Sequence, residues 1–329
     1  MPTRRRSSAS ASAIALALLA TACSAPTNEG GGLRRLSIAT GGTGGVFYPY
    51  GGGLAQVLSS KLPGVQATAE VTAASVDNLK FLKQGTSDIA FTMADMAQDG
   101  AAGTDAFADF GPVPVRVLAV LYPGYMHLVV RGAGGIATVA DLRGRVVSTG
   151  PPGAGSAVLA NRILATAGLD PSRDIRPHNL SVAQAVDAMK DGKLDAFFWV
   201  GGVPTAAVLD LMHSPGVAAK ILPLDSVLPA LHRAHGETLY YRTLIPKAAY
   251  SLSEDIPVVA VANLLVVSET MSESLAYDIT RVLFDEQPTL ATIHPQARDL
   301  AVETAIKGAT VPFHPGAIRF YRERGAWTQ

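Results

Sequence analysis

Short apolar stretches and segments of helical periodicity alternate along most of the chain, in an order that occurs twice. Each unit begins with a strand and a glycine-rich turn, at residues 41–45 in the first and 150–156 in the second. The first unit comprises a strand at 36–40, a helix to about 60, a strand at 65–71, a helix at 76–83 and a strand at 89–92. The second comprises a strand at 145–148, helices at 157–167 and 183–189, and a strand at 196–200.

The connection from helix to strand is repeated as well. A Lys-x-Gly-x-x-Asp pattern precedes an apolar strand in both units, with Gly85 and Gly192 at the helix C-cap position. Asp88 and Asp195 stand directly before the strands, and we interpret them as connection residues rather than as a catalytic pair. Because the pattern returns in the same order with the same loops, it indicates two α/β lobes of similar build.

Strands that alternate with helices predict an α/β fold with mostly parallel sheets and helices on both faces. Ligands of such sheets bind beyond the carboxyl ends of the strands, where both glycine turns lie, so a cleft between the lobes is expected. Tyr-Pro-Gly-Tyr at 122–125 separates two apolar strands and is interpreted as the first crossing between lobes, with the return between 221 and 240. The predicted domains are 35–124 with 235–329 as lobe 1, and 125–234 as lobe 2. A strand at 258–267 and a helix at 273–284 would rejoin lobe 1.

Charge and composition narrow the function. The 329 residues include 27 Lys and Arg and 27 Asp and Glu, so the net charge is zero and a nucleic-acid partner is not expected. Hydrophobic residues make up 48% of the chain, which is enough for a sizeable core.

The N-terminus has the features of an export signal. Three arginines at 4–6 precede a short apolar run that ends at Cys23, the only cysteine in the sequence. Residues 1–23 resemble a lipoprotein signal peptide with a lipobox at Cys23, and residues 24–34 predict a flexible tether. The alternative is an ordinary secretory signal cut near Ala22. We expect an exported protein, anchored by lipid on the outer face of the cytoplasmic membrane, with no later spanning segment.

Catalytic motifs do not assemble in the sequence. The first glycine turn lacks the third glycine of a dinucleotide fingerprint and the Gly-Lys-Ser/Thr of a phosphate loop, so no cofactor is expected. Ser156 lacks the flanking glycines of a nucleophile elbow. His232 and His235 beside Glu237 are interpreted as part of a solvated loop between lobes rather than a metal site, and His127 as a core or hinge histidine. The sequence therefore does not predict an enzyme or a metal site.

Several motifs together resemble the TAXI family, the substrate-binding components of one branch of tripartite ATP-independent periplasmic (TRAP) transporters. The matching segments are residues 39–51, 72–79, 85–90 with Asp95, 142–148, 150–156, 202–204 and 314–321. The sequence departs from the family where Ala73 and Ala74 replace the usual glycines, which puts a turn with positive φ in question. Pro151 and Pro152 stiffen the second glycine loop, and Ala157 removes a hydroxyl.

The resemblance implies a two-lobe, type II periplasmic-binding-protein fold that closes on a small organic anion such as glutamate or a 2-oxo or dicarboxylate. It also implies a membrane permease of the TRAP type, driven by an ion gradient, as partner. Carried over by position, the ligand-binding candidates are Thr43, Gly44, Gly45, Tyr48, Ser75, Asn78, Asp95, Ser156, Trp199 and Gly202. Each has a structural alternative, such as a plain turn for the glycines, a helix cap for Ser75 and Ser156, or the core for Trp199.

Two other functions are compatible with the sequence. The same fold would serve a ligand sensor that signals through a membrane partner without transport. A weaker alternative is an exported hydrolase that uses Ser156 or Ser75 as its nucleophile.

Overall fold

The computed structural model describes residues 33–327, which lie within one compact unit. The predicted signal peptide, Cys23 and residues 24–32 of the predicted tether lie outside the described residues. Within the described range, no helix combines the length and the apolar character needed to cross a membrane.

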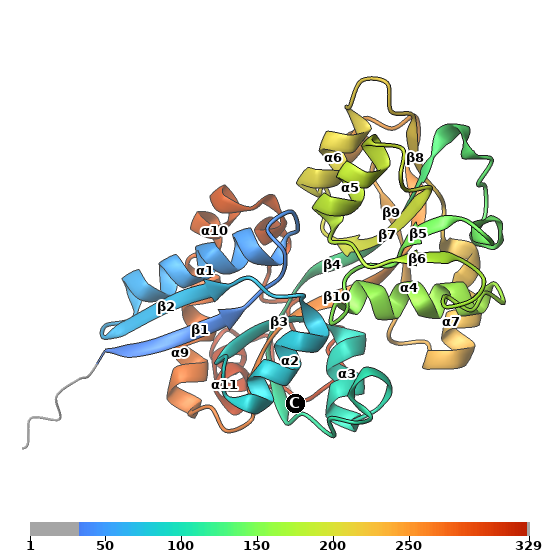
Figure 1. Cartoon of the computed structure of the whole chain (residues 1–329). Coiled ribbons are helices and arrows are strands. Elements are labelled where there is room, and N and C mark those ends of the chain that lie inside the picture. Colours follow the sequence, from blue (N-terminus) through green and yellow to red (C-terminus); the bar gives the residue numbers. More distant parts are fainter. Residues whose placement is uncertain (1–32, 328–329) are drawn as a thin grey trace, which may run out of the picture. The chain divides into compact units, whose positions relative to one another are not determined.

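A single ten-stranded sheet runs through the unit (Figure 1). Its main path has the order β2-β1-β3-β10-β4-β7-β5-β6, with β9 paired to β10 and β8 paired to β4. The strands are β1 (Arg34–Ala39), β2 (Val65–Glu70), β3 (Ile89–Met93), β4 (Val115–Arg131), β5 (Val146–Ser148), β6 (Arg176–His178), β7 (Ala196–Gly201), β8 (Ala219–Ile221), β9 (Tyr241–Ile245) and β10 (Ile256–Ser268).

The two flanks of the sheet repeat one topology. β2-β1-β3 on one side and β6-β5-β7 on the other are parallel and have the same order of first, second and third strand. The long strands β10 and β4 lie between them and pair antiparallel with each other and with the flanks. The predicted α/β fold is confirmed, but the parallel pairing is restricted to the flanks.

The repeated aspartates perform the same structural task in both flanks. The Asp88 carboxylate accepts a hydrogen bond from the Ser37 backbone N–H at 2.9 Å, and Asp195 accepts one from Val146 at 2.9 Å. The backbone N–H of Asp88 in turn donates to the Ser37 carbonyl, and that of Asp195 to the Val146 carbonyl, each at 2.9 Å. Their interpretation as connection residues is therefore confirmed.

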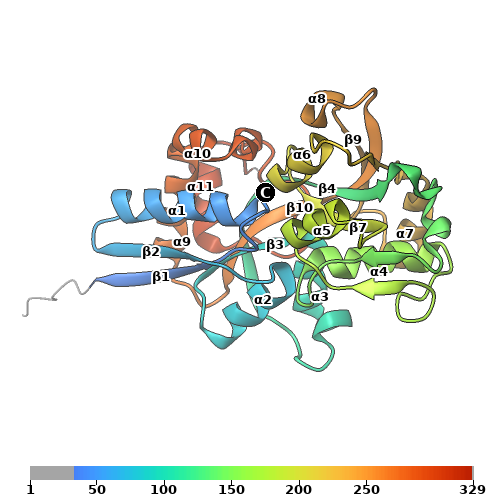
Figure 2. The ribbon, with the colours of Figure 1, turned by 45° about the horizontal axis from the view of Figure 1, so that its top comes forward.

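Helices follow the strands in matching positions, so α1 corresponds to α4, α2 to α5 and α3 to α6. Figures 1 and 2 show them packed on the two flanks of the sheet. The α-helices are α1 (Phe47–Lys61), α2 (Ser75–Gln84), α3 (Ala94–Ala102), α4 (Gly155–Thr166), α5 (Val182–Lys190), α6 (Ala206–Met212), α7 (Leu228–His235), α8 (Lys247–Tyr250), α9 (Glu273–Asp285), α10 (Gln287–Ile293) and α11 (Pro315–Glu323). As predicted, Gly85 ends α2 in the left-handed conformation, with φ of 71°.

The Tyr-Pro-Gly-Tyr segment at 122–125 does not split two strands, which corrects the prediction. It lies inside the continuous strand β4, opposite residues 260–263 of β10. A register shift of β10 between Asn263 and Leu264 accommodates the irregular backbone there. Gly124 is required because a Cβ at this position would lie 2.8 Å from the Asn263 side-chain nitrogen. Proline and glycine obscured this strand in the sequence, and pairing with β10 keeps the segment extended.

The second crossing is formed by β10. This strand pairs with β9 over residues 256–260 and with β3 over residues 263–267, so it connects β9 with the β2-β1-β3 flank. Ile245 and Tyr250 pack in the smaller hydrophobic cluster, together with residues of α5 and α6. The return crossing between the lobes therefore lies after residues 221–240, where the sequence placed it. The exact lobe boundaries stay a prediction, because the contacts do not divide residues 33–327 any further.

Candidate functional site

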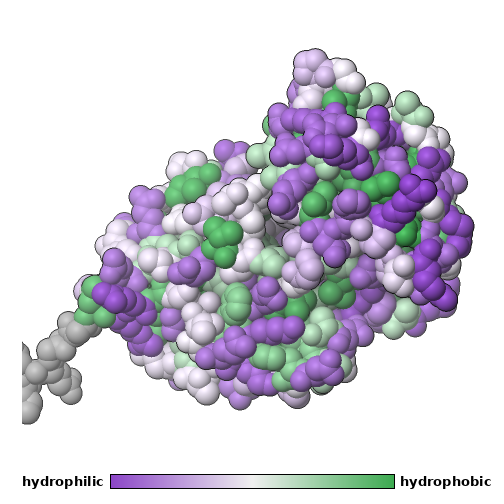
Figure 3. Space-filling model, viewed as in Figure 1, coloured by the Kyte–Doolittle hydropathy of each residue, from purple (hydrophilic) through white to green (hydrophobic). Residues whose placement is uncertain are grey.

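A cavity of about 350 Å³ lies where the strands of both flanks end. Figure 3 shows the surface hollowed between the two lobes. Both glycine turns, the segment after β2, the segment after β6 and the end of β7 contribute to its walls. The lining residues are Gly41, Gly42, Thr43, Gly44, Gly45, Val46, Phe47, Val71, Thr72, Ala73, Ala74, Ser75, Met93, Tyr122, Pro151, Ala154, Gly155, Ser156, Ser181, Val182, Ala183, Trp199, Val200, Gly201 and Asn263.

Four helices begin at this cavity. The first residues of α1, α2, α4 and α5 are Phe47, Ser75, Gly155 and Val182, and all four line it. The first backbone N–H groups of a helix have no partner within the helix, and the helix dipole adds partial positive charge at this end. The cavity wall therefore favours a negatively charged ligand.

The N-terminus of α2 already has a partner from the opposite lobe. The backbone N–H groups of Val76 and Asp77 donate to the Gly153 carbonyl at 3.0 and 3.2 Å. This contact joins the second glycine loop to α2 and closes the lobes against each other. The starts of α1, α4 and α5 are then the N-termini best placed to hold a ligand.

The cavity wall is electrically neutral apart from these backbone dipoles. Among the described residues that line it, none is Lys, Arg, His, Asp or Glu. An anion here would be held by backbone N–H groups and hydroxyls. The same wall supplies no general base for Ser75 or Ser156, and the Ser75 hydroxyl accepts a hydrogen bond from the Met93 backbone N–H at 3.1 Å.

Glycines allow the lobes to approach each other closely. A Cβ on Gly45 would lie 2.8 Å from the end of the Trp199 ring, and one on Gly44 would lie 3.2 Å from Ala183. On the opposite side, a Cβ on Gly155 would lie 2.8 Å from the Met93 sulfur. These close contacts are made between the two lobes. The glycines of both turns therefore allow the lobes to close against each other. By contrast, Gly42 has open space where its Cβ would be.

Six of the ten predicted site residues come together at the cavity, and four do not. Those that line it are Thr43, Gly44, Gly45, Ser75, Ser156 and Trp199. Tyr48, Asn78, Asp95 and Gly202 are not among the lining residues. That the six bind a ligand stays a prediction, whereas Asn78 and Asp95 have other partners.

Asn78 braces the loop beside the cavity from within the core. Its side chain is fully buried and donates to the backbone carbonyls of Thr40 and Phe91 at 2.6 and 2.8 Å. Its carboxamide oxygen accepts from the Thr72 hydroxyl at 2.6 Å. All these partners belong to the protein, so Asn78 positions the lining residue Thr72 instead of facing a ligand.

The two alanines that replace the usual glycines do not prevent the turn. Ala74 adopts φ of 98° and ψ of −141°, a conformation that alanine rarely takes. The Ala74 backbone N–H donates to the Thr72 hydroxyl at 3.0 Å, which helps to hold this strained turn. The sequence put a turn with positive φ in question here. The structure keeps such a turn, with Ala74 in a strained conformation.

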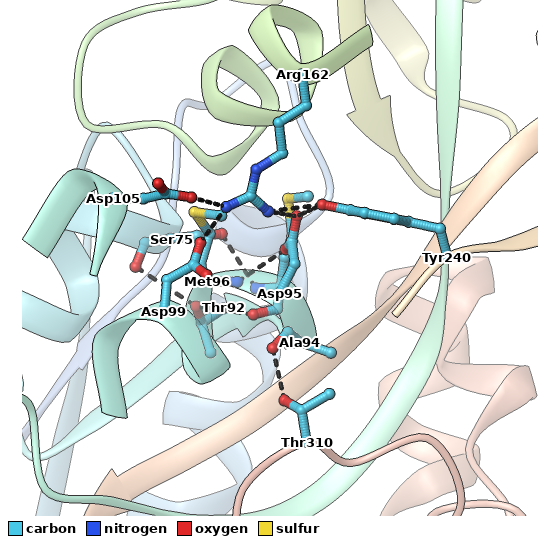
Figure 4. Close-up of polar contacts among 11 residues, drawn as sticks. Ser75, Thr92, Ala94, Asp95, Met96, Asp99, Asp105, Arg162, Tyr240 and Thr310 are labelled. Atoms are coloured by element: carbon cyan, nitrogen blue, oxygen red, sulfur yellow. Dashed lines mark hydrogen bonds and ion pairs between the residues drawn. The ribbon is translucent and has the colours of Figure 1, made fainter. Parts of the chain in front are cut away.

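Asp95 belongs to an ionic cluster that is buried except for Asp105, and we call it the Arg162 cluster: Arg162, Asp95, Asp99, Asp105 and Tyr240 (Figure 4). The guanidinium of Arg162, on α4, donates to Asp99 at 2.6 Å and to the Tyr240 hydroxyl at 2.7 Å, and it also pairs with Asp105. The Tyr240 hydroxyl donates to Asp95 at 2.9 Å. The cluster connects α3 of one lobe with α4 of the other.

Burial dominates the titration of Asp95. Its side chain is completely enclosed, and burial raises its pKa to about 6, although the Arg162 guanidinium and the Tyr240 hydroxyl act in the opposite direction. The oxygen atoms of this carboxylate are bonded to protein partners, the Tyr240 hydroxyl and the Met96 backbone N–H.

The histidines have structural roles. His127 is fully buried, its Nδ1 donates to the Tyr125 carbonyl at 2.8 Å and its Nε2 accepts from the Tyr250 hydroxyl at 3.0 Å. Its interpretation as a core histidine is confirmed. His232 and His235 lie on helix α7 and not in a loop, which corrects the prediction. His232 contacts the Tyr240 carbonyl through Nε2 at 2.8 Å.

The sequence analysis missed the contribution of α5 to the cavity. Ser181 caps this helix by accepting from the Gln184 backbone N–H, and the Gln184 side chain accepts from the Ser181 backbone N–H at 3.0 Å. Ser-x-x-Gln before a helical segment is a capping-box pattern, so the helix start was readable. Its position at the cavity depends on β6 lying next to β5, which the short strand did not reveal.

Comparison with known proteins assigns the family. The profile of the NMT1-like family matches residues 38–325, almost the whole of the described chain. The chain belongs to the NMT1-like family. This NMT1-like chain is also similar to several solved structures, all at low sequence identity.

Three of these structures illustrate the likeness. A protein of Bordetella bronchiseptica RB50 is 18% identical, with 89% of each chain covered and a TM-score of 0.52. A binding-protein component of an ABC phosphonate transporter from Pseudomonas aeruginosa is 14% identical, with 79% of each chain covered and a TM-score of 0.51. A protein of Xanthomonas citri bound to chloride is 14% identical, covering 89% of this chain and 96% of that one, with a TM-score of 0.50. The NMT1-like chain thus has the two-lobe α/β fold of periplasmic binding proteins.

Proposed function

We propose that this protein is an extracytoplasmic solute-binding protein of an uptake transporter, and that its cavity captures a small organic anion. The observation that carries the proposal is the convergence of four helix N-termini on a cavity whose described lining has no charged side chain. Neutral donors bind an anion reversibly, which suits a carrier that must release its ligand.

The walls come from both lobes, which favours binding by lobe closure. Ligand held between α1 of one lobe and α4 and α5 of the other would stabilise the closed form over an open one. A lining without a general base also favours a binding protein over a hydrolase.

We further propose that the partner is a TRAP-type permease driven by an ion gradient and that the protein is a TAXI-type component. The motif resemblance at residues 39–51 and 72–79 supports this branch. On the same basis, we propose that Cys23 carries a lipid that holds the protein on the outer face of the cytoplasmic membrane.

A thermal-shift screen of the purified protein against organic acids tests the binding function. Carboxylates, dicarboxylates and acidic amino acids are added singly, and a true ligand should raise the melting temperature saturably. At one hundred times its dissociation constant, the stabilisation is about 2.7 kcal/mol. Ser156→Ala, in the cavity wall, should reduce the shift, whereas Ser60→Ala, on α1 outside the cavity, should not. If no organic acid shifts the melting temperature, the proposed function is wrong.

Uptake measurements separate transport from sensing. Deleting the gene should abolish uptake of the ligand that the screen identifies. Unimpaired uptake in the deletion strain would favour the ligand sensor instead.

A further inference from the structure

We infer that the cavity selects organic acids that carry no ammonium group, so that 2-oxo acids and simple carboxylates bind while the corresponding amino acids do not. This inference rests on the proposed function, because it names the ligand class of the same cavity. It narrows the range of acids that the sequence resemblance implies, which includes glutamate.

The first argument is the absence of any acceptor for a positive charge in the described cavity wall. An amino acid brings an ammonium group together with its carboxylate, and a buried ammonium without an anionic partner is strongly unfavourable. The described lining contains no Asp or Glu. An amino acid in this cavity would therefore lose the hydration of its ammonium group without gaining an ion pair.

The second argument concerns three carboxylates close in sequence to lining residues. Glu70 directly precedes Val71, but it is exposed and accepts a hydrogen bond from the Thr68 hydroxyl at 3.3 Å. Asp77 stands two positions after Ser75, but its carboxylate packs against the Gly153 backbone, where an added Cβ would lie 2.4 Å from Oδ1. Asp95 stands two positions after Met93, but it is fully enclosed and bonded to Tyr240. None of the three is among the residues that line the cavity, and Asp95 already has protein partners.

The third argument is the direction of the helix dipoles. α1, α2, α4 and α5 all present their positive ends to this cavity. The same field that favours a carboxylate disfavours an ammonium group a few ångströms away. The selection against amino acids thus follows from the same feature that attracts the acid.

The remaining wall indicates the body of the ligand. Val71, Met93, Val182, Trp199 and Val200 give the cavity apolar surface beside the helix N-termini. Apolar walls with a few polar donors are typical of sites that orient a hydrocarbon body by one polar end. The inferred ligand is therefore a carboxylate with a short aliphatic or aromatic body, and an oxo group is compatible with the neutral donors.

Matched pairs of compounds test the inference by calorimetric titration of the purified protein. 2-Oxoglutarate is compared with glutamate, and 4-methyl-2-oxopentanoate with leucine, because each pair differs only in an oxo or ammonium group. At least one oxo acid should bind, and at least about a hundredfold more tightly than its amino partner, which corresponds to about 2.7 kcal/mol. An amino acid that binds as tightly as its oxo partner overturns the inference but leaves the proposed function intact. If neither these compounds nor any acid of the wider screen binds, both are wrong.

A variant that supplies the missing carboxylate gives an independent test. Ser181 lines the cavity and caps α5, and both Asp and Asn replace Ser well as helix caps. Ser181→Asp should therefore fold and should move the preference between oxo acid and amino acid by about tenfold toward the amino acid. Ser181→Asn keeps the site neutral and should leave the preference unchanged. If both variants change the preference equally, charge does not determine the selection.

Discussion

The lobes of this protein meet at two places of opposite electrostatic character. At the cavity, the described lining carries no charged side chain, and glycines of both turns bring the lobes together. At the Arg162 cluster, one guanidinium with only 7% of its side chain exposed faces two carboxylates and a tyrosine in the interior and the exposed carboxylate of Asp105.

This difference shows that charged side chains stabilise the contact between the lobes at the Arg162 cluster, whereas the cavity offers a ligand only uncharged groups. Buried charges need fixed partners, and those at the Arg162 cluster have them within the protein. Fixed cationic side chains in the cavity wall would hold an anion more tightly and slow its release. Helix α4 belongs to both places, since it begins at the cavity with Gly155 and carries Arg162 two turns later.

The largest effect is expected from breaking the charged contact. Arg162→Met removes the positive charge of the Arg162 cluster and leaves the Asp95 carboxylate buried beside Asp99. Loss of one partner of a buried ion pair costs about 3–5 kcal/mol of unfolding free energy. Urea denaturation of the variant and the wild type measures this loss. A loss below about 1 kcal/mol, the range of exposed pairs, would contradict the structural role of the cluster.

His127 provides the next largest effect, because folding keeps this buried group neutral. Burial lowers the pKa of His127 to about 4, whereas the ordinary pKa of a histidine is about 6.5. Between these values the unfolded chain binds the proton and the folded protein does not, so stability is lost as the pH falls from 6.5 to 4. The difference amounts to about 3 kcal/mol.

Urea denaturation at several pH values tests the titration of His127. His127→Gln cannot bind this proton and should show a loss smaller by about 3 kcal/mol over the same pH range. Equal pH dependence of the wild type and the variant would show that His127 titrates normally in the folded state.

A smaller effect is expected at the brace beside the cavity. Asn78→Ala removes the side-chain donor of the Phe91 carbonyl and leaves the Thr40 carbonyl with the Thr72 hydroxyl alone, which should lower the unfolding free energy by about 1–3 kcal/mol. Because Asn78 is outside the lining, ligand affinity should fall only through the displaced Thr72. A variant of unchanged stability that has lost all binding would restore Asn78 as a direct ligand contact.

The repeated architecture was predictable because its signals are local. Helical periodicity, the Gly85 cap and the aspartate before each third strand all operate within a few residues, and each was confirmed. The six cavity residues were carried over by position from the family resemblance, and their gathering at the cavity agrees with the rule that loops after parallel strands meet at one edge of a sheet.

What the sequence could not show depends on distant partners. Asp95 looked like a cleft residue because Tyr240, its hydrogen-bond donor, lies 145 positions away. Asn78 was a ligand-binding candidate, but its side chain is bonded to the Thr40 carbonyl, 38 positions earlier in the chain. The strand β4 passes through Pro123 and Gly124 because β10 holds it from one side, which no local propensity expresses.

The most direct test of the account compares two glycines of the same turn. Gly42 and Gly45 both line the cavity, but only a Cβ on Gly45 would collide with Trp199 across the lobes. Calorimetric titration with the acid that gives the largest thermal shift should show 1:1 binding to the wild type and to Gly42→Ala. Gly45→Ala should bind about tenfold more weakly or not at all, because overpacking opposes closure. Equal affinity of both variants would contradict the claim that the lobes close around the ligand through this uncharged glycine surface.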